Sequence, residues 1–374
     1  MISENALVWS VSFREFLGNE ATVRHLRESI GADRLPHALI LSGPRGAGKY
    51  TLAIMLAQTV NCLDPKQTDG LPDYCGVCAN CVRIGQAMDL DTRVDEAIAA
   101  REELREVDKK ETRILIQTHP DVLVIPPDPP QLLIKLGQVR TLVREIYRMP
   151  AEAKRAFYIF TSAAFMKEAA NSLLKALEEP PPHACIILLA ENLGDLLPTI
   201  RSRSCIFRLG AIPVDQIEAL LAERRGDWRP AQRALVARLA QGAVGQALGF
   251  DLDGYLASRA DALLIARNAV REPDYSALFR MTETYRAGAE GQEKTANLLG
   301  AMLSVLEDLL LIQSGTPKLV RNIDLEKELA ALAAQVDLDW IEAVERGVQR
   351  VRSGMRRNLL RSLSLDAFAT ELVR

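Results

Sequence analysis

Over roughly the first 210 residues, short runs of consecutive apolar residues alternate with stretches in which apolar residues recur at helical spacing. The apolar runs lie at residues 38–42, 121–125, 156–160 and 184–190. Unbroken rather than alternating runs are typical of strands that are covered on both faces. The helical patterns include residues 51–62 and residues 165–179, and prolines follow the second of these. Strands separated by helices predict a parallel α/β sheet.

From about residue 210 onward the pattern is helical and rich in Ala, Leu and Arg. Helices are expected at 214–224, 229–239, 254–268 and 293–314, and no strand is expected in this part of the chain. The coarse architecture is therefore an α/β domain followed by an all-helical region. We place one boundary near residue 210 and a weaker one near Gly249.

Length and composition narrow the possible classes of protein. The 374 residues fit two or three domains, and 25% charged with 48% hydrophobic residues is typical of a soluble globular protein. A net charge of −3 excludes a global basic excess, so a role with nucleic acid needs a local patch or a partner. No apolar run approaches the ~20 residues of a membrane span, and the first residues do not resemble a secretory signal. We therefore expect a cytoplasmic protein with no membrane partner.

Residues 89–113 are dense in charges of both signs. Opposite charges four residues apart suit a solvated helix. We interpret this segment as an exposed helical insertion without a function of its own.

The stretch GPRGAGKYT at residues 43–51 is nearly a phosphate-binding loop. In such a loop, glycines let backbone N–H groups surround the phosphates, the lysine reaches the terminal phosphates, and the next hydroxyl binds Mg²⁺. Gly43, Gly46, Gly48 and Lys49 are present, after an expected strand and before an expected helix. Tyr50 stands where Ser or Thr is needed. We therefore expect the phosphate cradle to be kept and the metal ligand to be lost.

A working ATPase also needs an acidic pair after a buried strand, to hold the metal and to activate water. The strand expected at 156–160 is followed by Thr161 and Ser162 instead. Hydrolysis by this chain alone is therefore not expected. Two alternatives stay open for the loop: a strand-to-helix turn kept for its shape, and a site that binds ATP without turnover.

Four cysteines, Cys62, Cys75, Cys78 and Cys81, have the spacing C-x12-C-x2-C-x2-C. Two-residue gaps let neighbouring sulfur atoms converge on one ion, and four thiolates complete a tetrahedral Zn²⁺ site with no open position for catalysis. The spacing predicts a structural zinc site. Reduced free cysteines and an iron–sulfur cluster are the alternatives.

Two arginines flank a serine just after the last apolar run of the α/β region, in PTIRSRSC at residues 198–205. An arginine on the rim of a domain can stabilise charge on a phosphate bound to a neighbouring subunit. The alternative is that Arg201 and Arg203 cap carbonyls or form ion pairs at a domain boundary.

Several stretches occur together in one family. They read FLGNE at 16–20, LPHALILSGPRGAGK at 35–49, HPDV at 119–122, NSLLKALEEPPPHACIILLAE at 171–191 and TIRSRS at 199–204. With the four-cysteine module inside the first α/β unit, they resemble the bacterial clamp-loader AAA+ subunits of DNA polymerase III, the delta-prime and gamma/tau group, over at least residues 13–250. The Ser-Arg-Cys motif of that family is matched by Ser202, Arg203 and Ser204.

Three departures from the family pattern indicate one of its branches. Gamma-type subunits are expected to keep a hydroxyl after the lysine, an Asp-Glu pair and a sensor arginine in the second domain. Tyr50, Thr161 with Ser162, and Gly245 stand at these positions here. The resemblance thus points to the delta-prime branch, which looks like an ATPase but acts as a stator.

The resemblance also implies roles for the rim residues and an organisation for the chain. Arg203, with Ser202 as its motif neighbour, would be an arginine finger contributed in trans to ATP bound by an adjacent gamma subunit. Residues 1–209 would form an AAA+ α/β domain containing the zinc module at about 62–81 and the charged insertion at about 89–113. A small helical lid at 210–252 and a helical collar domain at 253–374 would follow.

The implied partners are gamma/tau and delta clamp-loader subunits in a hetero-pentamer of the DNA polymerase III holoenzyme, the sliding clamp, and primed DNA reached through the complex. The alternative is a gamma/tau-type subunit that binds and hydrolyses ATP itself. A third reading, a zinc-ribbon module that binds DNA directly, is weakened because few basic residues lie near the cysteines.

Overall fold

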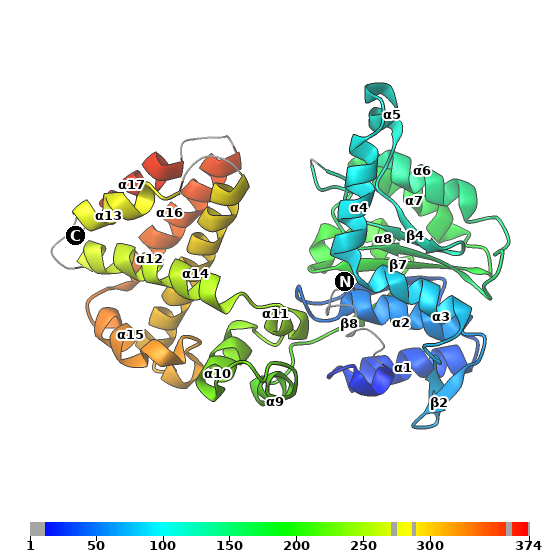
Figure 1. Cartoon of the computed structure of the whole chain (residues 1–374), viewed down its shortest axis with the longest axis horizontal. Helices are drawn as coiled ribbons and strands as arrows, with labels where there is room; N and C mark the ends of the chain where they lie inside the picture. Colours follow the sequence, from blue (N-terminus) through cyan, green and yellow to red (C-terminus); the bar gives the residue numbers. More distant parts are fainter. Residues whose placement is uncertain (1–11, 130, 271–274, 286–288, 357–360, 373–374) are drawn as a thin grey trace. The chain divides into compact units, whose positions relative to one another are not determined.

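The computed structural model of the chain describes residues 12–129, 131–270, 275–285, 289–356 and 361–372 (Figure 1). The chain divides into two compact units. The first contains residues up to Pro213 together with 242–246, and the second contains residues 214–241 and those from Ala247 onward. The further division of the helical part into a lid and a collar stays a prediction.

The first unit is built on a six-stranded sheet with the order β4-β5-β6-β7-β1-β8. Its strands are β1 (Ala38–Ser42), β4 (Ile116–His119), β5 (Val122–Ile125), β6 (Ala156–Phe160), β7 (Ala184–Ala190) and β8 (Cys205–Arg208). Along the sheet, each of the neighbouring pairs β5–β6, β6–β7, β7–β1 and β1–β8 is parallel. Strand β4 pairs with β5 in the antiparallel sense. The predicted parallel α/β sheet is therefore confirmed.

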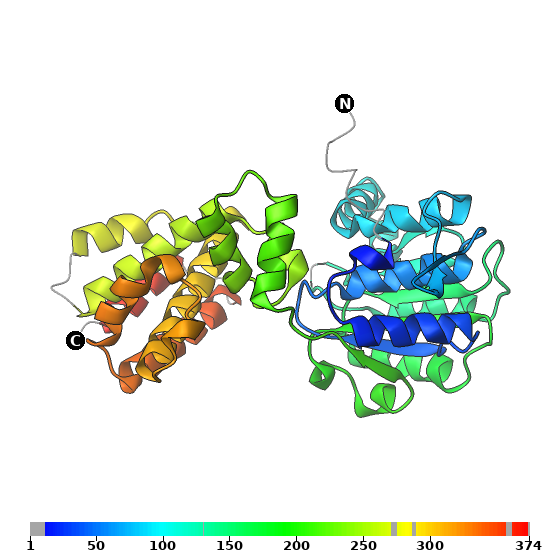
Figure 2. The ribbon, with the colours of Figure 1, turned by 90° about the horizontal axis from the view of Figure 1, so that it is seen from below.

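Helices cover both faces of this sheet (Figures 1 and 2). Helices α1 (Glu20–Gly31), α2 (Lys49–Asn61) and α3 (Ala79–Gly85) contribute to one core, and α6 (Leu136–Glu145), α7 (Lys167–Glu178) and α8 (Pro198–Arg201) to the other. Within β1, Leu39 and Leu41 belong to the first core and Ile40 to the second. This double coverage explains the unbroken apolar runs in the sequence.

The apolar pattern did not indicate four of the strands. Strand β8 has one half-buried residue and three exposed ones, and β4 lies at the other edge of the sheet. A separate hairpin, β2 (Lys66–Thr68) with β3 (Leu71–Asp73), lies between the first two cysteines of the cluster. Short strands that are exposed on one side do not produce an unbroken apolar run, so hydrophobicity alone does not reveal them.

The second unit is helical, and its described residues include no strand. Its helices are α9 (Val214–Arg224), α10 (Pro230–Leu239), α12 (Leu252–Val270), α13 (Tyr275–Thr282), α14 (Ala289–Gln313), α15 (Glu326–Ala333), α16 (Leu338–Arg356) and α17 (Arg361–Glu371), while α11 (Val244–Leu248) crosses between the two units. The predicted all-helical region is confirmed. The four helices that the sequence predicted there correspond to α9, α10, α12 and α14.

Helix α14 contains a long apolar segment. Its segment Gly291–Gln313 has a mean hydropathy of 1.6 and is long and apolar enough to cross a membrane by length and composition, although charged residues interrupt the apolar run. The expectation that no stretch approaches a membrane span therefore holds only for unbroken runs. In the structure, Leu298, Met302, Val305 and Leu309 of this helix are buried in the core of the second unit. A buried core helix passes the same test, so its composition is explained by packing.

The charged insertion forms α4 (Leu90–Glu102) and α5 (Glu106–Glu111). No residue of α4 is fully buried, which agrees with a solvated helix, but Val94 and Ile98 pack against the core of the first unit. Arg101 places Nη1 2.6 Å from Oδ1 of Asp128, whose side chain is completely buried after β5. Lys135 is the second cation beside this carboxylate, at 3.5 Å. The insertion is therefore tied to the segment that connects β5 to α6.

The connection between β4 and β5 fixes α3 against the sheet. The backbone N–H of Asp121 donates to Nδ1 of His119 at 3.1 Å, so the imidazole proton is on Nε2, which donates to Oδ1 of Asn80 at 3.2 Å. His119 is buried, and burial lowers its pKa, as does the nearby Arg83, while Asp121 and Glu152 act in the opposite direction. The neutral imidazole is thus the form that this arrangement stabilises.

We expect Arg101→Ala to destabilise the first unit by about 3 kcal/mol, because Asp128 keeps only the more distant Lys135 as a counter-ion in a buried position. Arg93→Ala is the matched control, since Arg93 forms an exposed pair with Glu96 on the same helix and its loss should cost less than about 0.5 kcal/mol. Urea unfolding of both variants measures the difference. Equal stability of the two variants would contradict the anchoring role of Arg101.

The buried His119 should make stability fall as the pH falls. Below the ordinary histidine pKa of about 6.5 the unfolded chain binds a proton that the folded protein does not, so stability is full above that pH and declines below it. The free energy of unfolding of the wild type should exceed that of His119→Gln at about pH 8. We expect this difference to shrink by roughly 1 kcal/mol between about pH 8 and pH 5.5. Urea midpoints at each pH measure it, and subtraction removes titrations common to both proteins. An advantage that grows on acidification would refute the assignment.

Candidate functional site

The glycine loop follows β1 and ends where α2 begins, at Lys49. Gly46 and Gly48 have φ angles of 79° and 82°, in the left-handed region that other residues rarely adopt. Gly48 is the N-cap of α2 and supplies no side-chain hydrogen bond to its first turn. These two glycines let the backbone turn sharply from β1 into α2, and the phosphate cradle that the sequence indicates stays a prediction.

The lysine of the loop is bonded to the loop itself. Its Nζ donates to the carbonyl oxygens of Gly43 and Pro44, both at 2.7 Å, and the side chain is only 9% exposed. Burial lowers the pKa of Lys49, while the charge of Glu191, which follows β7, partly offsets that effect. Lys49 would have to leave both carbonyls before it could bind a phosphate.

Tyr50 is directed away from the loop. Its hydroxyl donates to the carbonyl oxygen of Ala87 at 2.5 Å, in the short helix η3 (Gln86–Met88), and its ring packs against the core that contains α2 and α3. Burial raises the pKa of this phenol, and Asp91 adds to the effect. Tyr50 therefore ties α2 to the cysteine-bearing part of the chain and offers no ligand to a metal at the loop.

Residues 242–246 close over the loop from outside the sheet. The N–H of Gly245 donates to the carbonyl oxygen of Gly46 at 2.8 Å. A Cβ atom added to Gly46 would lie 2.8 Å from the backbone nitrogen of Gln246, and one added to Gly245 would lie 3.1 Å from the oxygen of Gly46. These two glycines let the segments approach each other, and a larger side chain at Gly245 requires the backbone to shift.

The turn after β6 contains no carboxylate. Thr161 donates its N–H to the carbonyl of Ile125, and the Ser162 hydroxyl accepts the N–H of Ala164 at 3.0 Å. Both residues are therefore used to shape the turn. The chain supplies neither the metal-binding Asp nor the water-activating Glu that ATP hydrolysis requires at this place.

The four predicted cysteines come together in the first unit. Their Sγ atoms all lie within 4.8 Å of one another, and two pairs, Cys62 with Cys78 and Cys75 with Cys81, are each 3.9 Å apart. A tetrahedral ion with metal–sulfur bonds of about 2.3 Å separates its ligands by about 3.8 Å. The four sulfur atoms are therefore close enough together to bind one metal ion.

Local structure explains the cysteine spacing. Cys62 caps the C-terminus of α2, the β2–β3 hairpin returns the chain to Cys75, and Cys78 and Cys81 lie at the start of α3. Backbone N–H groups of Cys75 and Cys78 donate to the sulfur atoms of Cys62 and Cys75, both at 3.3 Å. Burial raises the pKa of the Cys62 thiol, and the hydrogen bond from the backbone N–H of Cys75 acts in the opposite direction, toward the thiolate that a metal requires.

Arg203 lies between α8 and β8, at the opposite end of the sheet from the glycine loop. Cys205, two residues later, pairs with Leu39 near the start of β1, whereas the loop follows the end of that strand at Ser42. Because the two strands are parallel, the four residues from Leu39 to Gly43 separate these levels by about 13 Å. Arg203 and the chain's own glycine loop are therefore not brought together.

The Arg203 guanidinium is ordered by its own chain. Nη2 lies 2.8 Å from Oε1 of Glu178, and Nη1 donates to the Thr199 carbonyl at 3.1 Å and to the Ser202 hydroxyl at 3.4 Å. The side chain remains 36% exposed. Ser202 in turn donates its hydroxyl to the Thr199 carbonyl at 3.1 Å, which holds the end of α8.

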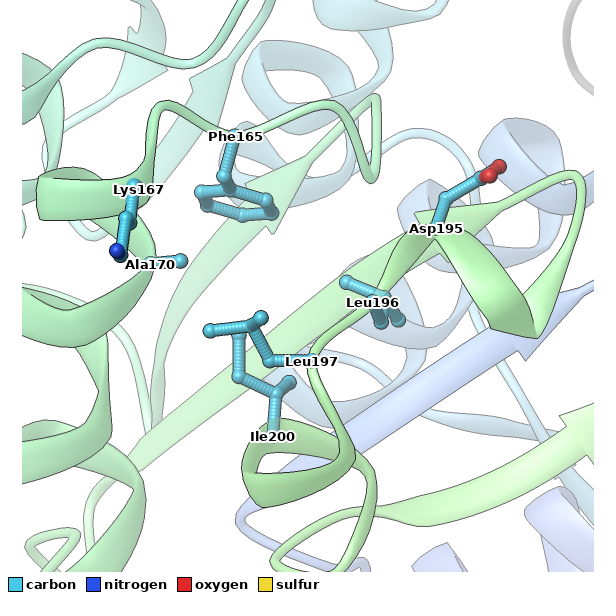
Figure 3. A pocket seen from close by; sticks show the side chains of 7 residues that line it. All are labelled: Phe165, Lys167, Ala170, Asp195, Leu196, Leu197 and Ile200. Atoms are coloured by element: carbon cyan, nitrogen blue, oxygen red, sulfur yellow. The ribbon is translucent and has the colours of Figure 1, made fainter.

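A small pocket of about 190 Å³ lies beside α8 (Figure 3). Its walls are mostly apolar, with Lys167 and Asp195 as the charged residues, and it is lined by Phe165, Lys167, Ala170, Asp195, Leu196, Leu197 and Ile200. None of the predicted site residues lines it. We assign it no chemistry.

Sequence reasoning missed several residues that support these features. Arg27 donates to the carbonyls of Thr68, Leu71 and Pro72 at 2.6 to 2.9 Å and so anchors the β2–β3 hairpin. Glu178 was visible only as part of a shared stretch, with no sign of its pairing with Arg203. Contacts of this kind join positions that are far apart in the sequence, so no local sequence pattern indicates them.

Comparison with known proteins places these features in a family. The family model described as "DNA polymerase III, delta subunit" matches residues 18–213. Among relatives, the DNA polymerase III subunit tau of Escherichia coli is 29% identical over 242 residues, which are 63% of this chain and 32% of that protein. Subunit delta' of Bacillus subtilis is 27% identical over 332 residues, 87% of this chain and 88% of that protein.

The gamma/tau subunit of Mycobacterium tuberculosis (strain H37Rv) is 27% identical over 93% of this chain, which spans 59% of that relative. This chain therefore spans only a third to three fifths of the tau and gamma/tau relatives named here. A solved structure of a DNA polymerase III gamma subunit-related protein from Thermotoga maritima covers 94% of this chain and 98% of its own, with 17% identity and a TM-score of 0.43.

The sheet order, the glycine loop at the end of β1 and the helical second unit agree with the AAA+ fold class that the resemblance implied. The matched family model covers more than half of the chain. This protein belongs to the DNA polymerase III delta-subunit family.

Proposed function

We propose that this chain is a delta-prime-type stator of the clamp loader. It does not hydrolyse ATP, and it supplies Arg203 in trans to the nucleotide of a neighbouring gamma/tau subunit. The observation that carries the proposal is the separation of Arg203 from the chain's own glycine loop by the length of β1. An exposed arginine at that edge cannot act on a phosphate held at the opposite edge, so it serves a phosphate on another chain.

The state of the glycine loop supports the same proposal. Lys49 is bonded to loop carbonyls, Tyr50 is bonded to Ala87, and Gly245 packs on Gly46. Each of these groups would have to move, or be replaced, for Mg²⁺ and ATP to bind productively. The loop glycines and Lys49 thus act as a strand-to-helix turn rather than as a catalytic site.

In this function the partners are the gamma/tau and delta subunits, the sliding clamp and primed DNA. Residues 210–252 serve as the helical lid and residues 253–374 as the collar domain that assembles with its counterparts. The protein works in the cytoplasm, where the replication complex assembles. DNA contact by this chain is modest, consistent with its net charge of −3.

The second candidate function is a gamma/tau-type ATPase. The observation in its favour is the similarity to subunits with those names, at 27 to 29% identity. It predicts magnesium-dependent binding and turnover of ATP by the isolated chain.

A direct assay separates the two functions. The purified chain is titrated with labelled ATP and Mg²⁺, and hydrolysis is measured alone and with gamma/tau, delta, the clamp and primed DNA of its own organism. We expect no turnover alone, and a partner-dependent ATPase that falls about 10³-fold per affected site in Arg203→Ala. Lys49→Ala is the control and should leave that ATPase unchanged. Turnover by the isolated chain that disappears in Lys49→Ala would overturn the stator and favour the ATPase.

We also propose that the four cysteines hold one structural Zn²⁺ ion. The purified chain should contain one zinc per molecule, and Cys81→Ser should lose it because Cys81 is the most buried of the four ligands. Cys205→Ser is the matched control, since Cys205 is exposed and lies outside the cluster. Metal analysis gives the stoichiometry, and thermal melting should show a lower midpoint after chelation. Visible absorbance from an iron–sulfur cluster, or a metal content unaffected by Cys81→Ser, would contradict the proposal.

A further inference from the structure

The ion pair between Arg203 and Glu178 joins two elements that are adjacent in space and separate in sequence. Glu178 is the last residue of α7, and Arg203 follows α8. Leu173 and Leu177 of α7 and Ile200 of α8 lie in the same core, and all three are buried. Helix α7 runs back from the end of β6 toward the start of β7, so its last residue lies at the edge of the sheet where β8 begins.

The exposure of the pair argues against a role in stability. The Arg203 and Glu178 side chains are 36% and 51% exposed, and ion pairs this exposed contribute little to folding. The Glu178 carboxylate instead restricts the long Arg203 side chain to one conformation. An unrestrained arginine side chain has many rotamers. If it becomes ordered only when it binds, the lost conformational entropy reduces the favourable free energy of the contact.

Donors remain on Arg203 after this ordering. A guanidinium has five N–H donors, and the described contacts of Arg203 are to the Glu178 carboxylate, the Thr199 carbonyl and the Ser202 hydroxyl. The group can therefore keep these contacts and still offer N–H groups to an oxygen of a phosphate. Thr199 and Ser202 fix Nη1, and Glu178 is the charged group that fixes Nη2.

We propose that Glu178 is the positioning residue of Arg203. Its carboxylate holds the guanidinium on the rim in the orientation that meets an anionic phosphate group of the neighbouring subunit, and it keeps that contact while the phosphate is engaged. This inference rests on the proposed function, because it specifies how the trans arginine is presented.

The test compares Glu178→Gln with Glu179→Gln in the reconstituted complex. Glutamine keeps the size of the side chain and removes its charge. Glu179 is the next residue, and within the described parts of the chain no ion pair involves it, so Glu179→Gln is the matched control. We expect Glu178→Gln to lower kcat of the partner-dependent ATPase about 10-fold with the KM for ATP unchanged, and Glu179→Gln to have no effect. The thermal midpoint of the isolated chain should not change in either variant.

A double-mutant cycle distinguishes positioning from a general structural effect. In the Arg203→Ala background, Glu178→Gln should cause no further loss, because the group that it positions is absent. An equal loss in both backgrounds would show that Glu178 acts without Arg203 and would overturn the proposal.

The remaining outcomes are also decisive. A rise in kcat in Glu178→Gln would mean that the carboxylate competes with the phosphate for Arg203, and no change would mean that the pair has no role; either result overturns the positioning role while leaving the trans arginine intact. If Arg203→Ala itself leaves the ATPase unchanged, the proposed function fails, and this inference fails with it.

Discussion

The burial of β1 on both faces and along both edges is the constraint on which the first unit depends. β1 lies between β7 and β8, and its side chains alternate between the two cores. Its carboxyl end determines where the glycine loop starts. Its amino end, through the register with β8, determines where the chain carrying Arg203 emerges. The position of β1 therefore determines where both the glycine loop and Arg203 lie in the first unit.

Polar groups of the glycine loop form hydrogen bonds with other groups of the same chain. The lysine ammonium has two carbonyl acceptors, and the loop carbonyl of Gly46 accepts the N–H of Gly245. The ammonium that would reach a phosphate in a working loop of this kind is here bonded to carbonyl oxygens of its own loop. A buried polar group costs free energy when it lacks a partner, so these internal bonds let the loop keep its shape without a ligand.

The sequence was most informative where one local cause dominates. Strands β1, β6 and β7 were predicted to the residue because burial on both faces leaves an unbroken apolar run. The convergence of the cysteines followed from their spacing, since two-residue gaps allow few alternatives. Edge strands β4 and β8 were not predicted, because their outer sides are not covered and no apolar run marks them.

Features that depend on distant partners were beyond sequence reasoning. The glycine loop could be recognised, but the bond from Tyr50 to Ala87 could not, because it depends on how η3 packs on α2. The insertion at 89–113 was expected to be a solvated excursion without its own function. Its helices are solvated, yet Arg101 reaches a buried carboxylate 27 positions later. A charge-rich pattern gives no indication of such a partner.

The close approach of Gly245 to Gly46 has a consequence for how this chain can change over evolutionary time. Residues 50, 161 and 162 already carry a Cβ atom, so a short hydroxyl or a carboxylate there needs only a change of side chain. An arginine at Gly245 would place its Cβ 3.1 Å from the carbonyl oxygen of Gly46, so the two segments must move apart by a few tenths of an ångström to accept it. A substitution at Gly245 therefore depends on an adjustment of the Gly46 turn, which a change of an existing side chain at the other positions does not require.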